Sequence, residues 1–343
     1  MIRVLVVDDS PTAREYLVHV LGSDPAIEVI GTARDGADAV RLARKLRPDV
    51  ITMDINMPLM DGMEATRTIM ETSPVPIVIV SGVWDAKEVE TTFKAVEAGA
   101  LAVVRRPAGL GRQEGAGAEQ DLVSKVKLMS EVKVVRRWPH QSQEPMKGPV
   151  DHAIEVRRDV DVIAVGASTG GPPALRTILS ALPPRFPAPV LIVQHIASGF
   201  IGGMVEWLSE TSRLRLHVAM EGEVMLPEHA YFAPDSFDMG VERGGVVHLS
   251  KDGFPVVRPS ISYLFRSVGN VYGERSVGVL LTGMGKDGAE ELKLMKERGA
   301  VTIVQDEESC VVFGMPREAI KLNAATYVLP PEKIAGALAK LGK

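Results

Sequence analysis

Residues 162–173 read VIAVGASTGGPP, and this stretch decides how the C-terminal half of the chain folds. The apolar run 162–165 is typical of a buried strand, and the glycines after it permit a tight turn. Pro172 and Pro173 then suit the first turn of a helix. A strand, a sharp turn and a helix in immediate succession predict one βα unit of a parallel sheet.

Comparable units follow this stretch. The segment VLIVQH at 190–195 predicts the next strand, and the series continues to a helix near 331–341. In residues 214–257, short strand-like runs are broken by glycine and proline, and we expect β-hairpins there. The C-terminal half therefore predicts an α/β fold, with a mostly parallel, doubly wound, Rossmann-like sheet and a β-hairpin insert.

An independent βα series precedes this half. Short apolar runs recur, with helix-length segments between them, at residues 4–7, 29–31, 50–53, 77–80 and 101–104. Five such units predict a small doubly wound domain with a parallel, flavodoxin-like sheet of five strands. The stretch 138–159 has prolines, mixed charge and no periodicity, which indicates a linker. We therefore expect domains at 1–130 and 160–343, joined by 131–159, which holds the end of the last N-terminal helix and the linker.

The bulk composition is that of a protein with ordinary buried cores. Of 343 residues, 45% are hydrophobic and 24% are charged, and the formal net charge of −5 gives no sign of a nucleic-acid-binding surface. Cys310 is the single cysteine, which excludes an intrachain disulfide and suits a reducing compartment. Asp8 and Asp9 lie where a signal peptide needs an apolar core, and no apolar run is long enough for membrane insertion. We expect a cytoplasmic protein.

Acidic residues follow two strands of the N-terminal series. Asp8 and Asp9 end the first strand and Asp54 ends the third, so their carboxylates are expected to meet at one sheet edge. Like charges held together are costly without a cation, and hard oxygen ligands suit Mg²⁺. Such an ion beside one carboxylate is what phosphoryl transfer to Asp54 requires. Ser81 ends the fourth strand, where its hydroxyl is placed to contact a phosphoryl oxygen.

The turn at Ser168 leaves three interpretations open. The segment 166–170 fits the G-x-S-x-G pattern of a nucleophilic serine beside a helix N-terminus. It could also bind an anion, although the G-x-G-x-x-G spacing and the P-loop lysine are missing. The third interpretation is a tight turn without chemistry.

Two further residues favour the nucleophile. His195 directly follows the strand 190–194, so it is expected at the same sheet edge as Ser168. Asp287 lies in a glycine-rich loop after the strand 276–281, where it can orient the imidazole or, alternatively, cap the next helix. The order Ser168, His195, Asp287 differs from the order in α/β-hydrolases, so this would be an independent triad.

The N-terminal domain resembles the response-regulator receiver family. The resemblance rests on VDDS at 7–10, DINMPLMDG at 54–62, Ser81-Gly82 and the strand that ends before Pro107. It implies phosphorylation of Asp54 by a histidine kinase, with Mg²⁺ held by Asp8, Asp9 and Asp54. Ser81 and Arg106 would contact the phosphoryl group. Receivers usually carry lysine at the position of Arg106 and an aromatic residue at that of Val103, which puts signal transmission in doubt more than phosphorylation.

The C-terminal domain resembles the catalytic domain of chemotaxis response regulator protein-glutamate methylesterases. The matching motifs are GASTGG at 166–171, QH at 194–195, PSISYLFRSV at 259–268, LLTGMGKDG at 280–288 and QDEESCVVFGMPREA at 305–319. The resemblance implies Ser168 as nucleophile, His195 as general base and Asp287 as its orienting residue. Backbone around Thr169 and Met284 would form the oxyanion hole.

The resemblance also implies a substrate and marks three departures. The substrate would be glutamyl methyl esters, and certain glutamines, of methyl-accepting chemotaxis receptors, with no cofactor in the esterase domain. Asp235, Asp238 and Ser262 replace the glycine, histidine and aspartate usual in the family, and we expect these positions near the substrate cleft. Two other functions stay open, namely a phosphorylation-dependent adaptor without turnover and a hydrolase of a different carboxyl ester. The complete Ser–His–Asp set argues against the adaptor.

Overall fold

The structure, a computed structural model, describes residues 1–82, 86–107, 115–132, 134, 159–252 and 258–340. The chain divides into two compact units, Met1–Pro149 and Val150–Lys343, called here the N-terminal and C-terminal units. The expected linker at 138–159 lies outside the described residues, apart from its last residue. The domain boundaries therefore stay a prediction.

The N-terminal unit is a parallel sheet of five strands in the order β2-β1-β3-β4-β5. The strands are β1 (Ile2–Val7), β2 (Ile27–Ala33), β3 (Val50–Met53), β4 (Ile77–Ser81) and β5 (Ala102–Arg105). The helices are α1 (Pro11–Gly22), α2 (Gly36–Leu46), α3 (Gly62–Thr72), α4 (Ala86–Ala98) and α5 (Gly115–Ser130). The doubly wound, five-stranded fold expected for this half is confirmed.

Sequence order explains where ligands can gather in this unit. The chain goes from β1 outward to β2 and then back across β1 to β3, so the direction of winding reverses between β1 and β3. In open parallel sheets, ligands bind outside the carboxyl ends of the strands at such a switch point. Asp8 directly follows β1 and Asp54 directly follows β3.

The C-terminal unit is a sheet of seven strands in the order β14-β13-β12-β6-β7-β9-β8, and every pairing in it is parallel. The main-sheet strands are β6 (Val162–Ala167), β7 (Val190–Gln194), β8 (Arg215–Val218), β9 (His229–Phe232), β12 (Ser276–Leu280), β13 (Val301–Gln305) and β14 (Tyr327–Leu329). The helices are α6 (Gly171–Ala181), α7 (Ile201–Ser209), α8 (Ile261–Val271), the short 3₁₀ helix η1 (Gly273–Arg275), α9 (Ala289–Glu297), α10 (Met315–Lys321) and α11 (Pro331–Leu338).

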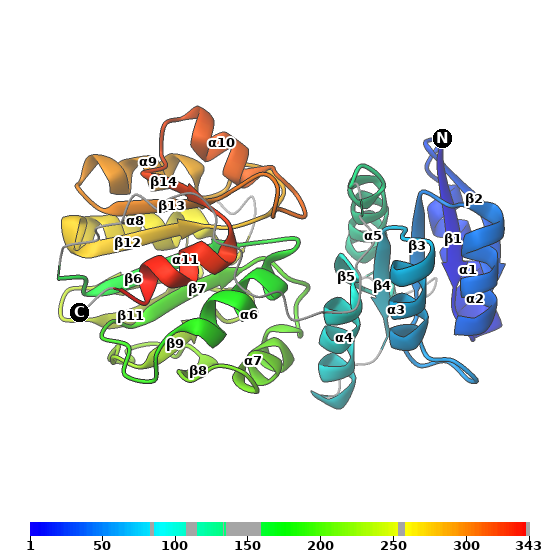
Figure 1. Cartoon of the computed structure of the whole chain (residues 1–343), viewed down its shortest axis with the longest axis horizontal. Coiled ribbons are helices and arrows are strands. Elements are labelled where there is room, and N and C mark those ends of the chain that lie inside the picture. Colours follow the sequence, from blue (N-terminus) through cyan, green and yellow to red (C-terminus); the bar gives the residue numbers. More distant parts are fainter. Residues whose placement is uncertain (83–85, 108–114, 133, 135–158, 253–257, 341–343) are drawn as a thin grey trace, which may run out of the picture. The chain divides into compact units, whose positions relative to one another are not determined.

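Helices cover both faces of this sheet, with α6 and α11 on one face and α8 and α9 on the other (Figure 1). Alternate residues of each strand point to opposite faces, so Val162 and Ala164 join the core beneath α8 and α9. Leu264 and Phe265 of α8 are fully buried in that core. The near-continuous apolar strands of the sequence thus reflect a sheet buried on both sides.

The insert differs in part from the expectation of hairpins. The strands β10 (Asp238–Glu242) and β11 (Val246–Ser250) do form an antiparallel hairpin, but β8 and β9 join the main sheet in parallel. The connection between β8 and β9 makes this possible because it runs beside β11 before returning. Gly222 N–H donates to Val247 O at 3.0 Å, and Val224 forms an isolated antiparallel bridge with Val246.

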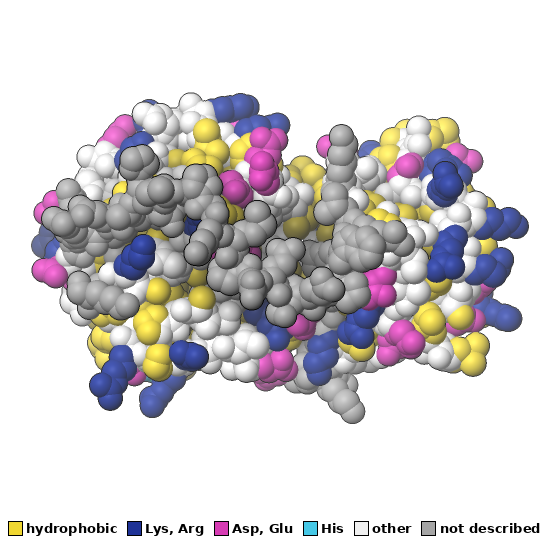
Figure 2. All heavy atoms as spheres, in the orientation of Figure 1, with side chains coloured by type: hydrophobic (Ala, Val, Ile, Leu, Met, Phe, Trp, Pro, Cys, Tyr) yellow, Lys and Arg dark blue, Asp and Glu magenta, His cyan; other side chains and the backbone are white. Residues whose placement is uncertain are grey.

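Two observations concern the surface and the membrane. On the described part of the face in Figure 2, basic and acidic side chains are interspersed with apolar ones. No helix in the described part of the chain is long and apolar enough to cross a membrane.

Candidate functional site

Ser168, His195 and Asp287 lie at the carboxyl edge of the C-terminal sheet. They follow β6, β7 and β12 in the chain, and these three strands are neighbours in the order β12-β6-β7. The winding reverses at β6, because β7 is added on one side of it and β12 on the other. The three residues therefore occupy the switch point at which a doubly wound sheet binds its ligand.

The serine lies on a turn whose geometry requires glycine. Gly170 has φ +81°, in the left-handed region, and precedes the first residue of α6. A Cβ atom at Gly170 would lie 2.5 Å from the Cβ of Val311, so a side chain would both strain the backbone and collide. Ser168 is 5% exposed, and its carbonyl accepts a hydrogen bond from Gly171 N–H at 2.8 Å. The turn directs the chain from the strand into α6 with Ser168 beside the helix N-terminus.

Gln194, to which no role was assigned from the sequence, joins the serine turn to the histidine. Its side-chain amide is buried and donates to Ser168 O at 2.8 Å and to His195 O at 2.9 Å. His195 N–H in turn donates to Ala167 O at 2.9 Å. A buried polar residue at the end of an apolar strand was the available signal for this role.

Asp287 faces the imidazole of His195. The distance from His195 Nε2 to Asp287 Oδ2 is 3.0 Å, although Nε2 lacks the angle of a hydrogen bond in this ring orientation. Among the described residues, no hydrogen bond joins the Ser168 hydroxyl to the imidazole. Catalytic hydrogen bonds are often long or poorly aligned without substrate, so Ser168 and His195 remain the candidate nucleophile and general base.

The carboxylate of Asp287 is held by the start of α8. Ile261 N–H donates to Oδ2 at 2.8 Å and Ser262 N–H donates to Oδ1 at 3.0 Å. Burial raises the pKa of Asp287, but the interactions with His195 and Ser262 outweigh it and lower the pKa to about 2. The alternative that Asp287 caps the following helix is wrong, because Gly288 is the N-cap of α9 and has no side chain for capping.

The loop that carries Asp287 approaches the serine closely. A Cβ atom at Gly283 would lie 2.5 Å from Ser168 Cβ, so only glycine permits this approach. The next residue, Met284, has a side chain that is 55% exposed, and its backbone N–H has no partner in the described part of the chain. Thr169 is 7% exposed, and its carbonyl accepts a hydrogen bond from the Thr282 hydroxyl at 2.9 Å.

A second candidate site lies in the N-terminal unit. Oxygen atoms of Asp8, Asp9 and Asp54 lie within 4.8 Å of one another. Arg106 Nη2 lies 3.1 Å from Asp8 Oδ2 and 2.9 Å from Asp54 Oδ1, so one guanidinium pairs with two carboxylates. Burial raises the pKa of Asp54 to about 6, against the opposing charge of Arg106. Burial likewise raises the pKa of Asp8.

These residues fit a hard divalent cation such as Mg²⁺. Three carboxylates supply oxygen ligands, and Asp8 Oδ2 is buried without a hydrogen bond of proper geometry. Ser81 is 6% exposed at the end of β4, and its carbonyl accepts the N–H of Arg106 at 2.7 Å. The backbone therefore holds Ser81 and Arg106 together at the edge where Asp54 lies.

The three departures from the family pattern lie in different surroundings, and their place near a substrate cleft stays a prediction. Asp238 is 4% exposed and accepts a hydrogen bond from Arg258 Nε at 3.1 Å, which makes it part of the protein interior. Ser262 binds Asp287 through its N–H, and its hydroxyl accepts the N–H of Gly288 at 2.9 Å. Asp235 accepts the N–H of Gly199 at 2.6 Å and is partly exposed.

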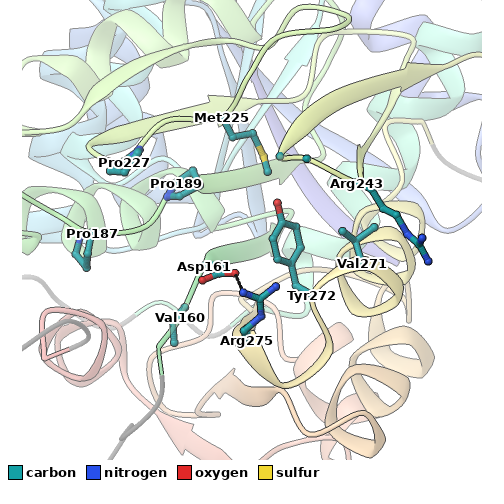
Figure 3. A pocket seen from close by; sticks show the side chains of 12 residues that line it. Val160, Asp161, Pro187, Pro189, Met225, Pro227, Arg243, Val271, Tyr272 and Arg275 are labelled. Atoms are coloured by element: carbon teal, nitrogen blue, oxygen red, sulfur yellow. Dashed lines mark ion pairs between the residues drawn. The ribbon is translucent and has the colours of Figure 1, made fainter.

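Two other features take no part in this site. Burial raises the pKa of Cys310 to about 12, so its thiol stays protonated and is a poor nucleophile. A cavity of about 650 Å³, lined by Pro189, Met225 and Tyr272 among others, lies where β6 and β7 begin (Figure 3). Asp161 and Arg275 form an ion pair of 2.6 Å in its wall. The cavity is thus at the edge of the sheet opposite Ser168.

Comparisons with known proteins cover both units. A family model described as CheB methylesterase matches residues 163–338, and one described as response regulator receiver domain matches residues 4–113. A relative from Nitrosospira multiformis, named protein-glutamate methylesterase/protein-glutamine glutaminase, is 55% identical over 99% of this chain and 97% of its own length. A relative from Syntrophus aciditrophicus with the same function in its name is 54% identical over 99% of this chain and 98% of its own. The crystal structure of the Thermotoga maritima CheB methylesterase catalytic domain matches with a TM-score of 0.51 and 38% identity, over 54% of this chain and all of that one.

Proposed function

The chain belongs to the CheB methylesterase family and carries a response-regulator receiver domain in front of the methylesterase domain, and from this premise we propose that it is a phosphorylation-regulated serine hydrolase. Its substrates are glutamyl methyl esters, and certain glutamines, on methyl-accepting chemotaxis receptors. The observation that carries the proposal is the meeting of Ser168, His195 and Asp287 at the carboxyl edge of three adjacent strands.

The geometry suits acyl transfer in two steps. Ser168 Oγ attacks the ester carbonyl while its proton passes to the His195 nitrogen that faces away from Asp287. The tetrahedral intermediate then collapses, and His195 gives its proton to the leaving methoxide. Methanol is released, and the glutamyl group stays bound to Ser168 as an ester. Water hydrolyses this ester by the same route in reverse, which yields glutamate and free serine. With a glutamine side chain the leaving group is ammonia.

Neighbouring groups supply the rest of the catalysis. Asp287 holds the imidazole in one orientation and stabilises it when protonated. We assign the backbone around Met284 and Thr169 to the oxyanion hole; support comes from the Met284 N–H, which has no partner within the described part of the chain, and from the position of Thr169 just before the N-terminus of α6. The esterase domain needs no cofactor for this chemistry.

The receiver domain supplies the regulation. We assign Asp54 as the phosphorylated residue, with a histidine kinase as phosphodonor and with Ser81 and Arg106 in contact with the phosphoryl group. Asp8, Asp9 and Asp54 would hold Mg²⁺, which when bound neutralises phosphate charge during transfer. Residues 1–130 form this domain and 160–343 the esterase, with 131–159 between them. A protein with these partners works in the cytoplasm.

Replacing the nucleophile tests the proposal. Ser168→Ala removes one hydroxyl from a turn and leaves no large cavity, so the fold should be retained. The loss of a triad nucleophile costs about 10⁶-fold in kcat. The measurement is methanol release from methyl-esterified receptor membranes, and activity within tenfold of the wild type would refute the assignment of Ser168.

A further inference from the structure

The first turn of α8 holds the carboxylate of Asp287, so the position of that carboxylate depends on where the helix begins. Backbone N–H groups of Ile261 and Ser262 bind its two oxygens at 2.8 and 3.0 Å. The hydroxyl of Ser260 lies 3.3 Å from Oδ1. A shift of this turn would move Asp287 and, through it, the imidazole of His195. Small misplacements of catalytic groups cost large factors in rate.

Asp238, the first residue of β10, is bound to the start of this helix. Its Oδ1 accepts the backbone N–H of Ser260, the N-cap of α8, at 2.8 Å. Its Oδ2 accepts Arg258 Nε at 3.1 Å, two residues before the cap. Because Asp238 is 4% exposed, water cannot readily replace it as acceptor for the Ser260 N–H. The buried carboxylate of Asp238 thus binds both Arg258 and Ser260, in the segment that leads into α8.

The strand that carries Asp238 is packed directly against the same helix. Val241 N–H donates to Ser267 Oγ of α8 at 3.1 Å. A Cβ atom at Gly240 would lie 2.8 Å from that same oxygen, so only glycine allows the strand to come this close. The strand β10 and the helix α8 are therefore in contact at more than one point. These contacts fix the position of Asp238 relative to Ser260.

The geometry of the ion pair favours a role in positioning over one in stability. Arg258 pairs with Asp238 through Nε, while its Nη2 is buried without a hydrogen bond among the described residues. A bidentate pair, which is the strong arrangement, would use both. Buried ion pairs often add little net stability, yet removing one partner leaves the other buried and unpaired.

We propose that Asp238, with Arg258 as its counter-ion, is a positioning residue of the esterase. It acts through the Ser260 N–H and the first turn of α8, which hold Asp287 against His195. Asp238 does not touch the reacting atoms. This inference rests on the proposed function, because it assumes that Ser168, His195 and Asp287 act together.

A double-mutant cycle in the full-length protein tests the route of action. Asp238→Ala should lower kcat about 10- to 100-fold, with KM nearly unchanged, because the misplaced group serves the reaction more than substrate binding. In an Asp287→Asn background the same change should have less than about a twofold effect, because the group it positions is already lost. An equal loss in both backgrounds, or a loss confined to KM, would overturn the inference.

Glu291 offers a matched control. Its side chain is 9% exposed and pairs with Arg266 of α8 at 2.6 Å, and within the described part of the chain it forms no hydrogen bond or ion pair with residues 260–262. Glu291→Ala should lower stability, measured by thermal unfolding, while kcat stays within about twofold of the wild type. A kcat loss equal to that of Asp238→Ala would show that the loss of any ion pair beside α8 has this effect, which would contradict a specific role. If Asp238→Ala does not fold, Asp238→Val, which fills more of the space and also lacks an acceptor for the Ser260 N–H, carries the same cycle.

Labelling of Ser168 by a fluorophosphonate separates this inference from the proposed function. The probe needs an activated serine but no receptor. If the wild type reacts and Asp238→Ala reacts about 10- to 100-fold more slowly, the positioning role holds even where receptor esters are not hydrolysed. If both react at the same rate, the positioning role is wrong although the triad is real. If the wild type does not react at all, both the triad and the inference built on it are wrong.

Discussion

Asp54 of the N-terminal unit and Asp287 of the C-terminal unit are both largely buried carboxylates at the carboxyl edge of a parallel sheet, yet their pKa values move in opposite directions. Burial raises the pKa of Asp54 to about 6, because the charge of Arg106 only partly opposes it and the neighbouring Asp8 adds to it. Burial also acts on Asp287, but interactions with His195 and Ser262 reverse its effect and lower the pKa to about 2.

The two aspartates differ in the groups that interact with their carboxylate oxygens. Asp287 has both oxygens bound by backbone donors and lies 3.0 Å from His195 Nε2, which suits a residue that must stay ionised and in one orientation. Asp54 has two other carboxylates, Asp8 and Asp9, and a single guanidinium beside it, which suits a residue that must receive a metal ion and a phosphoryl group. Burial alone therefore does not decide the ionisation of a buried aspartate, and the donors around it do.

The largest expected effect is the loss of phosphorylation in Asp54→Asn. The amide preserves the shape of the side chain but lacks the nucleophilic oxygen, so labelling by acetyl phosphate with Mg²⁺ should disappear. The measurement is the mass of the intact protein before and after incubation. Asp61→Asn, which alters the N-cap of α3, is the control and should still be labelled. Labelling that persisted in Asp54→Asn, or that needed no divalent metal, would show that the acidic site has another role.

Asp287→Asn should lower kcat about 10⁴-fold, because an amide cannot hold the imidazole in the tautomer that accepts the serine proton. Methanol release from methyl-esterified receptor membranes measures the effect. Asp161→Asn breaks an ion pair at the opposite edge of the same sheet and should leave kcat unchanged. A loss below tenfold in Asp287→Asn would mean that its many donors serve the fold and not the histidine.

Acid should weaken the contribution of Asp287 to stability. Its folded-state pKa, about 2, lies below the ordinary value of 3.8, so the ionised form stabilises the fold above pH 3.8. This stabilisation, about 2 kcal/mol, is lost as the pH falls through about 2. Urea unfolding of the wild type and of Asp287→Asn, at pH 6 and near pH 2, measures this contribution. The difference in the free energy of unfolding between the two proteins should be smaller near pH 2 than at pH 6 by about 2 kcal/mol. A difference that does not change with pH would contradict the lowered pKa.

The smallest effect concerns Arg106. Because its guanidinium already pairs with Asp8 and Asp54, and because it is a planar fork where receivers usually carry lysine, we expect weak transmission of the phosphorylation signal. Beryllofluoride, a phosphoryl mimic, should raise the wild-type esterase rate by less than about fivefold, and more in Arg106→Lys. Strong activation of the wild type that lysine leaves unchanged would show that arginine transmits the signal equally well.

The sequence alone was sufficient for the framework of both units. Apolar runs at regular spacing predicted parallel, doubly wound sheets, and the carboxyl ends of those strands predicted where Asp54, Ser168 and His195 would lie. These inferences succeed because strand periodicity and glycine turns are local properties, and because parallel strands place all their carboxyl ends at one edge. The same local signals were insufficient for the insert, where β8 and β9 pair in parallel and their connection runs beside β11.

Only the tertiary structure decided how the candidate residues are held. The alternative of Asp287 as a helix cap was as good as its role beside His195 until α8, earlier in the chain, was seen to bind its carboxylate. The double pairing of Arg106 and the link through Gln194 were equally hidden. The physical reason is that backbone N–H and C=O groups are the same in every residue, so the contacts that Asp287 and Gln194 make with them have no signature in the sequence. The pairing of Arg106 joins side chains that are far apart in the sequence, and only the folded chain brings them together.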